Sequence, residues 1–204
     1  MPNQIIFILG GARSGKSKFA EGLALELGGQ VTYIATAEAG DLEMADRIAR
    51  HQASRPVAWK TIEAPLELAE AIRSTAGTDI IIVDCITLYL TNLLMRELGP
   101  IEDSENPVIA PELEAKIQAN ITELIHAAKK STALVILVAN EVGLGLVPPF
   151  TVGRFFRDLA GRTNREIATS ADKVFLLTAG IAVELKELSV TYQQAAAEIK
   201  KSRI

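Results

Sequence analysis

Five short runs of apolar residues along the chain show no alternation with polar ones. Because a strand with this pattern must be buried on both faces, the runs predict strands inside a covered sheet. Segments with helical spacing lie between them, as at Phe19, Leu23 and Leu27, and along residues 113–125. The predicted strands are residues 5–9, 31–35, 80–84, 133–139 and 173–178.

Strands separated by helices indicate an α/β fold with a mostly parallel sheet and helices on both faces. The chain has 204 residues, which suits one domain with a substantial core. We expect this domain to span residues 1–187, with a loop over residues 98–111. Residues 188–204 are predicted to form a C-terminal helical tail that ends in Lys200, Lys201 and Arg203.

The composition narrows the class of partner. A net charge of −4 argues against a dedicated nucleic-acid binder and favours small-molecule ligands. Cys85 is the only cysteine, so the chain can form neither an internal disulfide nor a Cys-based zinc site. Residues 1–4 carry no basic side chain, and no apolar run approaches the roughly 20 residues that span a bilayer. We therefore expect a cytoplasmic protein with no membrane partner.

The stretch GGARSGKS, residues 10–17, matches the phosphate-loop pattern G-x-x-x-x-G-K-S/T between a predicted strand and a predicted helix. Its glycines allow backbone N–H groups to turn toward an anion, and the helix N-terminus adds positive charge. Lys16 is expected to reach the β- and γ-phosphates, and Ser17 to ligate Mg²⁺. The fold expected is therefore P-loop NTPase-like. A glycine-rich turn without a ligand is the alternative.

Asp84 ends the third predicted strand, so its carboxylate emerges at the carboxyl edge of the sheet. If its strand neighbours the strand before the phosphate loop, the carboxylate lies beside that loop. It then suits the acidic Mg²⁺ ligand of a P-loop enzyme. Aspartate also ends strands simply as a turn former.

Residues 41–56 predict a helix that ends near Arg55 and carries Arg47 and His51 on one face. Neighbouring arginines disfavour a charged histidine, which leaves a neutral imidazole nitrogen available as a nucleophile or base. Cations also simply suit a helix C-terminus. The residues alone leave both interpretations open.

Further motifs follow the phosphate loop in order along the chain. They are Tyr33-Ile34-Ala35-Thr36, Glu43-Met44-Ala45 with Arg47, Ile48 and His51, Arg55-Pro56 with Trp59 and Glu63, Asp84-Cys85-Ile86-Thr87, Thr91-Asn92-Leu93-Leu94, residues 140–148, and residues 156–164.

This series, from about residue 5 to residue 186, closely resembles the bifunctional adenosylcobinamide kinase and adenosylcobinamide-phosphate guanylyltransferase family of vitamin B12 synthesis. The resemblance implies phosphorylation of the aminopropanol hydroxyl of adenosylcobinamide by ATP or GTP. Transfer of GMP from GTP to that phosphate then follows, through a guanylyl-histidine and with release of pyrophosphate. The family histidine falls on His51, whereas His126 lies in a predicted amphipathic helix with no accompanying cluster. The resemblance also implies a homotrimer with active sites near subunit contacts.

The resemblance implies two catalytic residues, His51 and Lys16, and two Mg²⁺ ligands, Ser17 and Asp84. Arg47, Arg50 and Arg55 are expected near the triphosphate. The implied nucleotide contacts are Gly10, Gly11, Ala12, Arg13, Ser14, Gly15, Lys16, Ser17, Ile34, Ala35, Thr36, His51, Gln52, Ala53, Ser54, Glu63 and Asp84.

Two later segments have competing interpretations. Residues 140–149 leave the fourth strand at the edge where open α/β sheets bind ligands, so they either shape the corrinoid site or only connect two elements. The arginines of the following helix either meet phosphate or form a solvated face. These are Arg154, Arg157, Arg162 and Arg165.

Two other functions stay open on the residues alone. One is a P-loop kinase of another small alcohol, which needs no covalent intermediate. The other is a nucleotide-dependent switch that acts on a partner. His51 separates them from the bifunctional enzyme, because only nucleotidyl transfer requires a nucleophile there.

Overall fold

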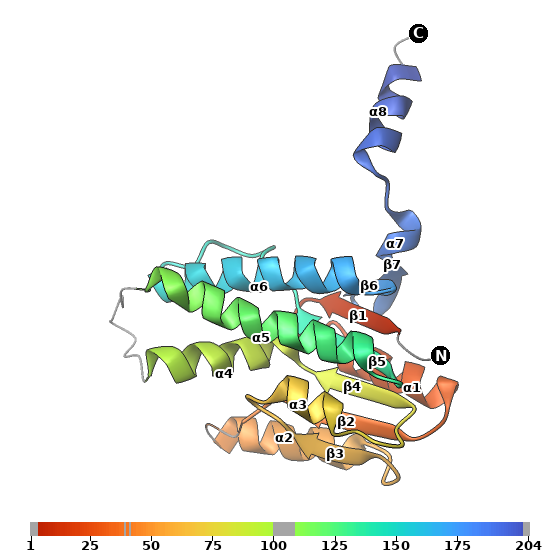
Figure 1. Ribbon diagram of the computed structural model, residues 1–204, viewed down its shortest axis with the longest axis vertical. Coiled ribbons are helices and arrows are strands. Elements are labelled where there is room, and N and C mark those ends of the chain that lie inside the picture. Colours follow the sequence, from red (N-terminus) through yellow and green to blue (C-terminus); the bar gives the residue numbers. More distant parts are fainter. Residues whose placement is uncertain (1–3, 39, 41, 100–108, 202–204) are drawn as a thin grey trace.

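A central sheet organises the fold of the computed structural model, which describes residues 4–38, 40, 42–99 and 109–201 (Figure 1). The described residues form one sheet of seven strands in the order β3-β2-β4-β5-β1-β6-β7. Neighbouring strands are parallel except for β7, which is antiparallel to β6. The strands are β1 Ile5–Gly10, β2 Val31–Ala35, β3 Lys60–Glu63, β4 Ile80–Asp84, β5 Leu134–Asn140, β6 Lys173–Thr178 and β7 Ile181–Glu184.

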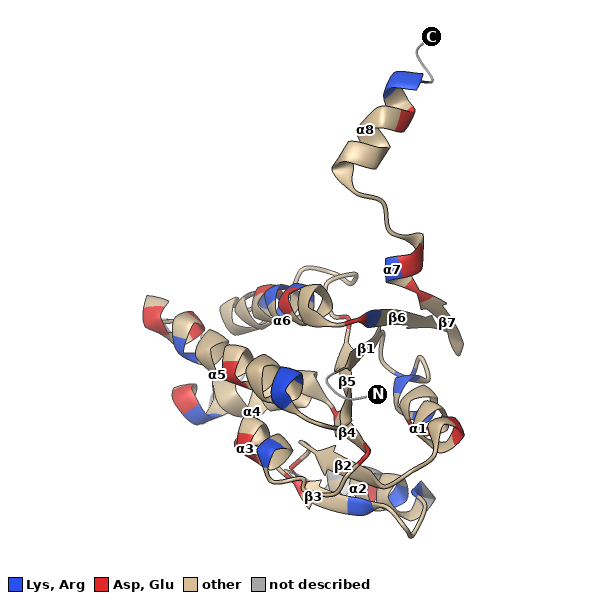
Figure 2. Cartoon of the chain, turned by 45° about the vertical axis from the view of Figure 1, so that its right-hand side comes forward, with Lys and Arg blue, Asp and Glu red and all other residues tan. Residues whose placement is uncertain are grey.

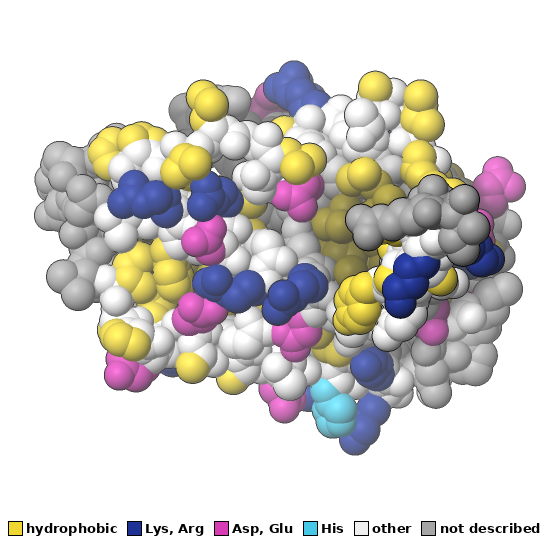
Figure 3. Space-filling model, turned by 90° about the horizontal axis from the view of Figure 1, so that it is seen from above, with side chains coloured by type: hydrophobic (Ala, Val, Ile, Leu, Met, Phe, Trp, Pro, Cys, Tyr) yellow, Lys and Arg dark blue, Asp and Glu magenta, His cyan; other side chains and the backbone are white. Residues whose placement is uncertain are grey.

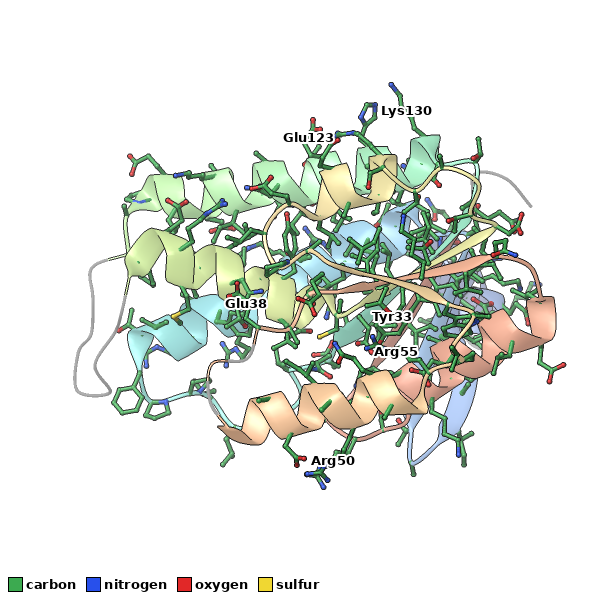
Figure 4. All side chains as sticks on the ribbon, turned by 90° about the horizontal axis from the view of Figure 1, so that it is seen from below. Tyr33, Glu38, Arg50, Arg55, Glu123 and Lys130 are labelled. Atoms are coloured by element: carbon green, nitrogen blue, oxygen red, sulfur yellow. The ribbon has the colours of Figure 1, made fainter. Side chains whose placement is uncertain are left out.

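Helices cover both faces of this sheet. Figure 4 shows α1 and α2 together on one side of it, and α4 and α5 on the other. With α3 and α6 also packed on the second side, both faces are enclosed. The helices are α1 Lys16–Leu27, α2 Leu42–Ser54, α3 Leu68–Arg73, α4 Ile86–Leu98, α5 Pro111–Lys130, α6 Thr151–Ser170, α7 Leu185–Leu188 and α8 Tyr192–Lys201.

The strand interiors divide their side chains between two hydrophobic layers. Phe7 and Val83 belong to the layer under α3 to α6, while Ile8 and Ile82 belong to the layer under α1. All four are fully buried. This two-sided burial explains why the central strands read as continuous apolar runs, and it confirms the predicted α/β architecture.

All five predicted strands are present, but β3 and β7 were not predicted. Both are short edge strands with partly exposed side chains, so neither produces a continuous apolar run. The apolar stretch of residues 174–183 also contains a turn, at Ala179 and Gly180, where φ is 52° and 81°. The turn divides this stretch into the antiparallel pair β6 and β7.

The helix indicated by the spacing of Phe19, Leu23 and Leu27 is present as α1, but its fully buried face lies one position further along the chain. Ala20 and Ala24 are fully buried, whereas Leu27 is 43% exposed. The reason is that α1 packs with its smallest side chains against the sheet, so its bulkier residues lie at the margins of the contact. In α5 the predicted stripe is correct, because its five members are buried: Leu113, Ile117, Ile121, Leu124 and Ile125.

The C-terminal segment departs from the predicted single helix, because residues 189–191 are not helical. The described helix is α8, which follows a break after α7, extends away from the sheet and has no buried residue (Figure 2). Residues 100–108 of the predicted loop and residues 202–204 of the tail lie outside the described residues. Of the helices that the structure describes, none has both the length and the apolarity to cross a membrane.

Candidate active site

The phosphate-loop sequence forms a tight turn between β1 and α1. A Cβ on Gly10 would come within 2.4 Å of the carbonyl oxygen of Leu177, so only glycine fits there. Gly15 stands before the first turn of α1 with φ 99°, and Arg13 also has a positive φ of 57°. The glycines of the motif are thus required by the local backbone.

Contacts from neighbouring segments hold the loop in this shape. The amide of Gly180 donates to the carbonyl of Ser14 at 3.0 Å, and the amide of Glu141 donates to that of Gly10 at 2.9 Å. Lys16 is 7% exposed, and its ammonium donates to the carbonyl of Gly11 at 2.7 Å. The buried hydroxyl of Ser14 has no hydrogen-bond partner among the described atoms. A cation enclosed by a preformed loop at a helix N-terminus suits a bound phosphate.

Asp84 ends β4, but that strand is not adjacent to β1. Strand β5 lies between them, so the condition for placing Asp84 directly beside the phosphate loop is not met. Two strand spacings correspond to about 10 Å. The charge of Lys16 nevertheless acts on Cys85, the residue after Asp84, and lowers the pKa of that thiol against the larger effect of burial, which raises it to about 11.

The donor set at this edge fits a Mg²⁺ ion carried by a nucleotide. Ser17 and Asp84 offer hydroxyl and carboxylate oxygens, which are the hard ligands that Mg²⁺ prefers. No group of three or more His, Cys, Asp or Glu side chains among the described residues could hold a metal ion by itself. That agrees with Mg²⁺ sites of phosphoryl-transfer enzymes, where one or two carboxylates act together with substrate phosphates.

Residues 34–36 reach the same edge, with their side chains inside the fold. Ile34 and Thr36 are fully buried. The Thr36 hydroxyl donates to the carbonyl of Cys85 and accepts from its amide, both at 2.7 Å. Asn92 of α4 donates to the carbonyl of Thr36 at 2.8 Å. Glu63, at the end of β3, pairs with Ala35 and is exposed.

His51 lies in the last turn of α2 and is half-buried. Directly after this helix, the guanidinium of Arg55 stacks 3.5 Å from the ring centroid of Tyr33 (Figure 4). The Tyr33 hydroxyl in turn donates to Oδ2 of Asp84 at 2.7 Å. The end of the helix that carries His51 is therefore packed toward the edge that carries Asp84.

Of the arginines expected near the triphosphate, Arg55 lies at this edge and Arg50 does not. Arg50 pairs with Asp46 and points away from the body of the protein on the outer side of α2 (Figure 4). The side chain of Arg47 lies outside the described residues, as does that of Ser54. Gln52 and Ala53 are exposed.

The family model for cobinamide kinase / cobinamide phosphate guanyltransferase matches residues 6–185. The chain belongs to this family. The matched range holds the phosphate loop, His51 and Asp84. It ends before α8, so the predicted division between residues 1–187 and 188–204 stays a prediction.

Relatives of the cobinamide kinase family cover most of the chain. The bifunctional adenosylcobalamin biosynthesis protein CobU of Escherichia coli K12 is 42% identical over 183 residues, 89% of this chain and 99% of the relative. CobU of Salmonella typhimurium LT2 is 44% identical over the same shares of the two chains. The bifunctional adenosylcobalamin biosynthesis protein CobP of Pseudomonas aeruginosa is 44% identical over 88% of this chain and 95% of the relative.

A solved structure shares the fold with this family member. It is an ATPase of a bacterial type III secretion system, with a TM-score of 0.54 and 16% sequence identity, over 98% of this chain and 63% of that one. At this identity the likeness shows the fold alone, and it supports the predicted P-loop NTPase-like class.

In this cobinamide kinase family member, sequence reasoning missed two residues beside Asp84. Tyr33 was noted only as part of a motif, and Glu21 was not noted. Burial raises the pKa of Glu21, Arg55 opposes the rise and Asp84 adds to it, so the three groups lie within electrostatic range. Glu21 stands one helical turn after Ser17, and that spacing is the signal that would have found it.

Three arginines of α6 contact surface carboxylates or the backbone of the adjoining loop. Arg154 donates to the carbonyl of Pro148 at 3.1 Å, and Arg162 pairs with Glu114 at 2.6 Å. Arg157 pairs with Asp158 at 3.0 Å. Figure 3 shows basic and acidic side chains interspersed on this side of the molecule. The contacts favour the solvated, charge-paired face over a phosphate site.

The loop of residues 140–149 begins beside the phosphate loop, since Asn140 pairs with Gly10. Its start is held by Asn164, which donates to the carbonyl of Asn140 at 3.1 Å. Farther along, Leu144 is 88% exposed and Leu146 is 97% exposed. The loop that leaves β5 at the carboxyl edge, where open α/β sheets bind their ligands, therefore carries exposed apolar side chains.

Proposed function

We propose that this protein catalyses both reactions in its family's description. It phosphorylates the aminopropanol hydroxyl of adenosylcobinamide with ATP or GTP, and then transfers GMP from GTP to that phosphate in cobalamin biosynthesis. The observation that carries the proposal is the convergence of the phosphate loop, Asp84 and the His51-bearing end of α2 on one edge of the sheet.

In the kinase reaction, the substrate hydroxyl attacks the γ-phosphorus, the bridging P–O bond breaks, and the nucleoside diphosphate leaves with the hydroxyl proton released. The phosphate loop from Gly10 to Ser17 binds the phosphates, and Lys16 neutralises the charge that develops on them. Ser17 and Asp84 would hold Mg²⁺, which supplies further charge neutralisation when it is bound.

In the guanylyl transfer, a ring nitrogen of His51 attacks the α-phosphorus of GTP, and pyrophosphate leaves. The phosphate oxygen of adenosylcobinamide phosphate then attacks the same phosphorus and breaks the P–N bond. A neutral imidazole suits both steps, because it is a nucleophile when it attacks and a good leaving group once it is protonated. The nucleotide would contact the residues that the family resemblance implies, which are residues 10–17, 34–36, 51–54, 63 and 84.

The proposal extends to the substrate and the assembly. The exposed apolar loop of residues 140–149 would receive part of the corrinoid, since it adjoins the phosphate loop. The protein would act in the cytoplasm as a homotrimer, as the resemblance implies.

The test is to incubate the protein with Mg²⁺ and GTP labelled on the α-phosphate, without a corrinoid. We expect a protein-bound label that is labile to acid and stable to base, as a phosphoramidate is. Lys16→Ala and His51→Ala should lose the label, while His126→Ala, on the exposed face of α5, should keep it. Adding adenosylcobinamide phosphate should then release the label onto the corrinoid.

The outcomes separate the competing functions. Phosphorylation of a corrinoid without any protein-bound label would indicate a kinase alone. GTP hydrolysis without transfer to a corrinoid would indicate a switch. A label that persists in His51→Ala would contradict the assignment of the nucleophile.

A further inference from the structure

One side chain, Tyr33, contacts two parts of the candidate site. It is 1% exposed in the middle of β2. Its hydroxyl donates to Oδ2 of Asp84 at 2.7 Å, and its ring lies 3.5 Å from the guanidinium carbon of Arg55. Burial raises the pKa of Tyr33 far above its ordinary value, so the hydroxyl keeps its proton and acts as the donor.

Among the described residues, no carboxylate is hydrogen-bonded to the Arg55 side chain. Its Nε and Nη1 atoms are buried and have no hydrogen-bond partner among the described atoms, and the same holds for Oε1 of Glu21. A buried donor without a partner is unfavourable, because the group loses its hydrogen bonds to water and gains none in the protein. The contacts that offset this are the face of the Tyr33 ring and the charges of Glu21 and Asp84.

The position of Arg55 relates this contact to the nucleophile. Arg55 directly follows α2, which ends at Ser54, and His51 lies about one helical turn earlier. On the other side, the hydrogen bond from Tyr33 occupies one oxygen of Asp84 and restricts how the carboxylate turns. Tyr33 thus connects the element that carries His51 to the carboxylate proposed for Mg²⁺.

We propose that Tyr33 is a positioning residue with two separable roles, its hydroxyl orienting Asp84 and its ring holding Arg55 so that the end of α2 presents His51. The role of the ring rests on the proposed guanylyl transfer. The role of the hydroxyl requires only that Asp84 takes part in binding the magnesium complex of a nucleotide.

The first experiment removes the hydroxyl and keeps the ring. The affinity of Tyr33→Phe for a non-hydrolysable GTP analogue is measured with Mg²⁺ and again with EDTA. We expect the gain in affinity that Mg²⁺ provides to fall about tenfold, because a hydrogen bond to a charged carboxylate is lost. The matched control is Tyr89→Phe, which removes a hydroxyl from a buried tyrosine on the opposite face of the sheet.

Tyr33 as an ordinary core residue predicts a different result. In that case Tyr33→Phe would change the affinity for the analogue by the same factor, or not at all, with and without Mg²⁺, so that Mg²⁺ would still provide its full gain in affinity, as it should in Tyr89→Phe. Either outcome would overturn the role of the hydroxyl. Thermal unfolding of each variant shows that the comparison is made between folded proteins.

The second experiment removes the cation and keeps the hydroxyl. Arg55→Gln should bind the magnesium complex of the analogue within about twofold of the wild type, yet form the guanylyl-protein at least about tenfold more slowly. Arg55→Lys, which can still stack on the ring, should recover most of the rate. Arg73→Gln on the surface of α3 is the control, with labelling unchanged.

The results distinguish failure of this inference from failure of the proposed function. Loss of analogue affinity in Arg55→Gln would overturn the role of the ring, because it would place Arg55 on the triphosphate. Equal labelling of Arg55→Gln and the wild type would overturn it as well. Absence of label in the wild type itself would contradict the guanylyl transfer, while the magnesium result for Tyr33→Phe would still decide the role of the hydroxyl.

Discussion

Single residues determine which of the two proposed reactions is affected by a change. Lys16 and the phosphate loop should serve both, because each reaction begins with a bound nucleoside triphosphate. His51 should serve only one, because the kinase step transfers the γ-phosphate without a covalent intermediate. The half-buried place of His51 at the end of a surface helix gives the fold little dependence on it.

His51→Ala should therefore keep the kinase turnover and lose the transfer of GMP to background. The reason is that alanine removes the nucleophile and leaves the phosphate loop and Asp84 intact. The two rates are measured separately, one with labelled γ-phosphate and one with labelled α-phosphate. His126→Ala should leave both unchanged, and an equal loss of both rates in His51→Ala would mean that His51 is structural.

At the scale of elements, a carboxylate joins β7 to α7. Glu184 caps α7, and its oxygens accept from the amides of Val174 at 2.9 Å and Glu187 at 2.6 Å. The bond from the Val174 amide is the largest cause that lowers the pKa of Glu184. These contacts of Glu184 lie close to the candidate active site in the chain, because the turn before β7 supplies the Gly180 amide that donates to the phosphate loop.

Glu184→Ala should lower the free energy of unfolding by about 1 kcal/mol at neutral pH, as loss of a helix N-cap does. A lowered pKa in the folded state means that this contribution is complete above the unfolded pKa of about 4.5. It is lost as the pH falls through the lower pKa of the folded state. The free energies of unfolding of the two proteins, measured with urea at several pH values, should therefore converge at acid pH.

The control for this prediction is Glu187→Ala, which removes only an exposed ion pair with Lys173. Its effect should be below about 0.5 kcal/mol. A difference between the wild type and Glu184→Ala that stays constant from neutral to acid pH would contradict the role of the carboxylate.

At the scale of the whole molecule, the sheet and its two helical layers hold the candidate site, and α8 stands apart. The matched family range ends at residue 185, and α8 has no buried residue. Leu185, in contrast, packs against the core. The fold and the proposed assembly should thus depend on α7 and not on α8.

Deletion of residues 190–204 should leave both reactions intact and change the free energy of unfolding by less than about 0.5 kcal/mol, because no residue of α8 is buried. Light scattering should give the same number of subunits for the shortened and the full chain. We expect a trimer for both. Deletion from residue 185 onward should destabilise the protein measurably. If the protein that lacks residues 190–204 dissociated into smaller assemblies, the tail would instead belong to a subunit interface.

The local patterns of the chain determined the architecture and the nucleotide site. Buried strands of a covered parallel sheet are apolar on both faces, so their positions could be predicted from five runs of sequence. The phosphate loop was equally predictable, because its backbone shape requires glycine at specific positions such as Gly10 and Gly15. Both features depend on residues that are close together along the chain.

Only the tertiary structure decided how these parts meet. The apolar sequence of a strand buried on both faces does not indicate which strands lie beside it. The sequence therefore could not show that β5 separates β1 from β4. The same holds for the contacts of Tyr33 with Asp84 and Arg55, which join residues 51 and 22 positions apart. Such contacts follow from the order of strands and the packing of α2, which long-range burial determines and local pattern does not.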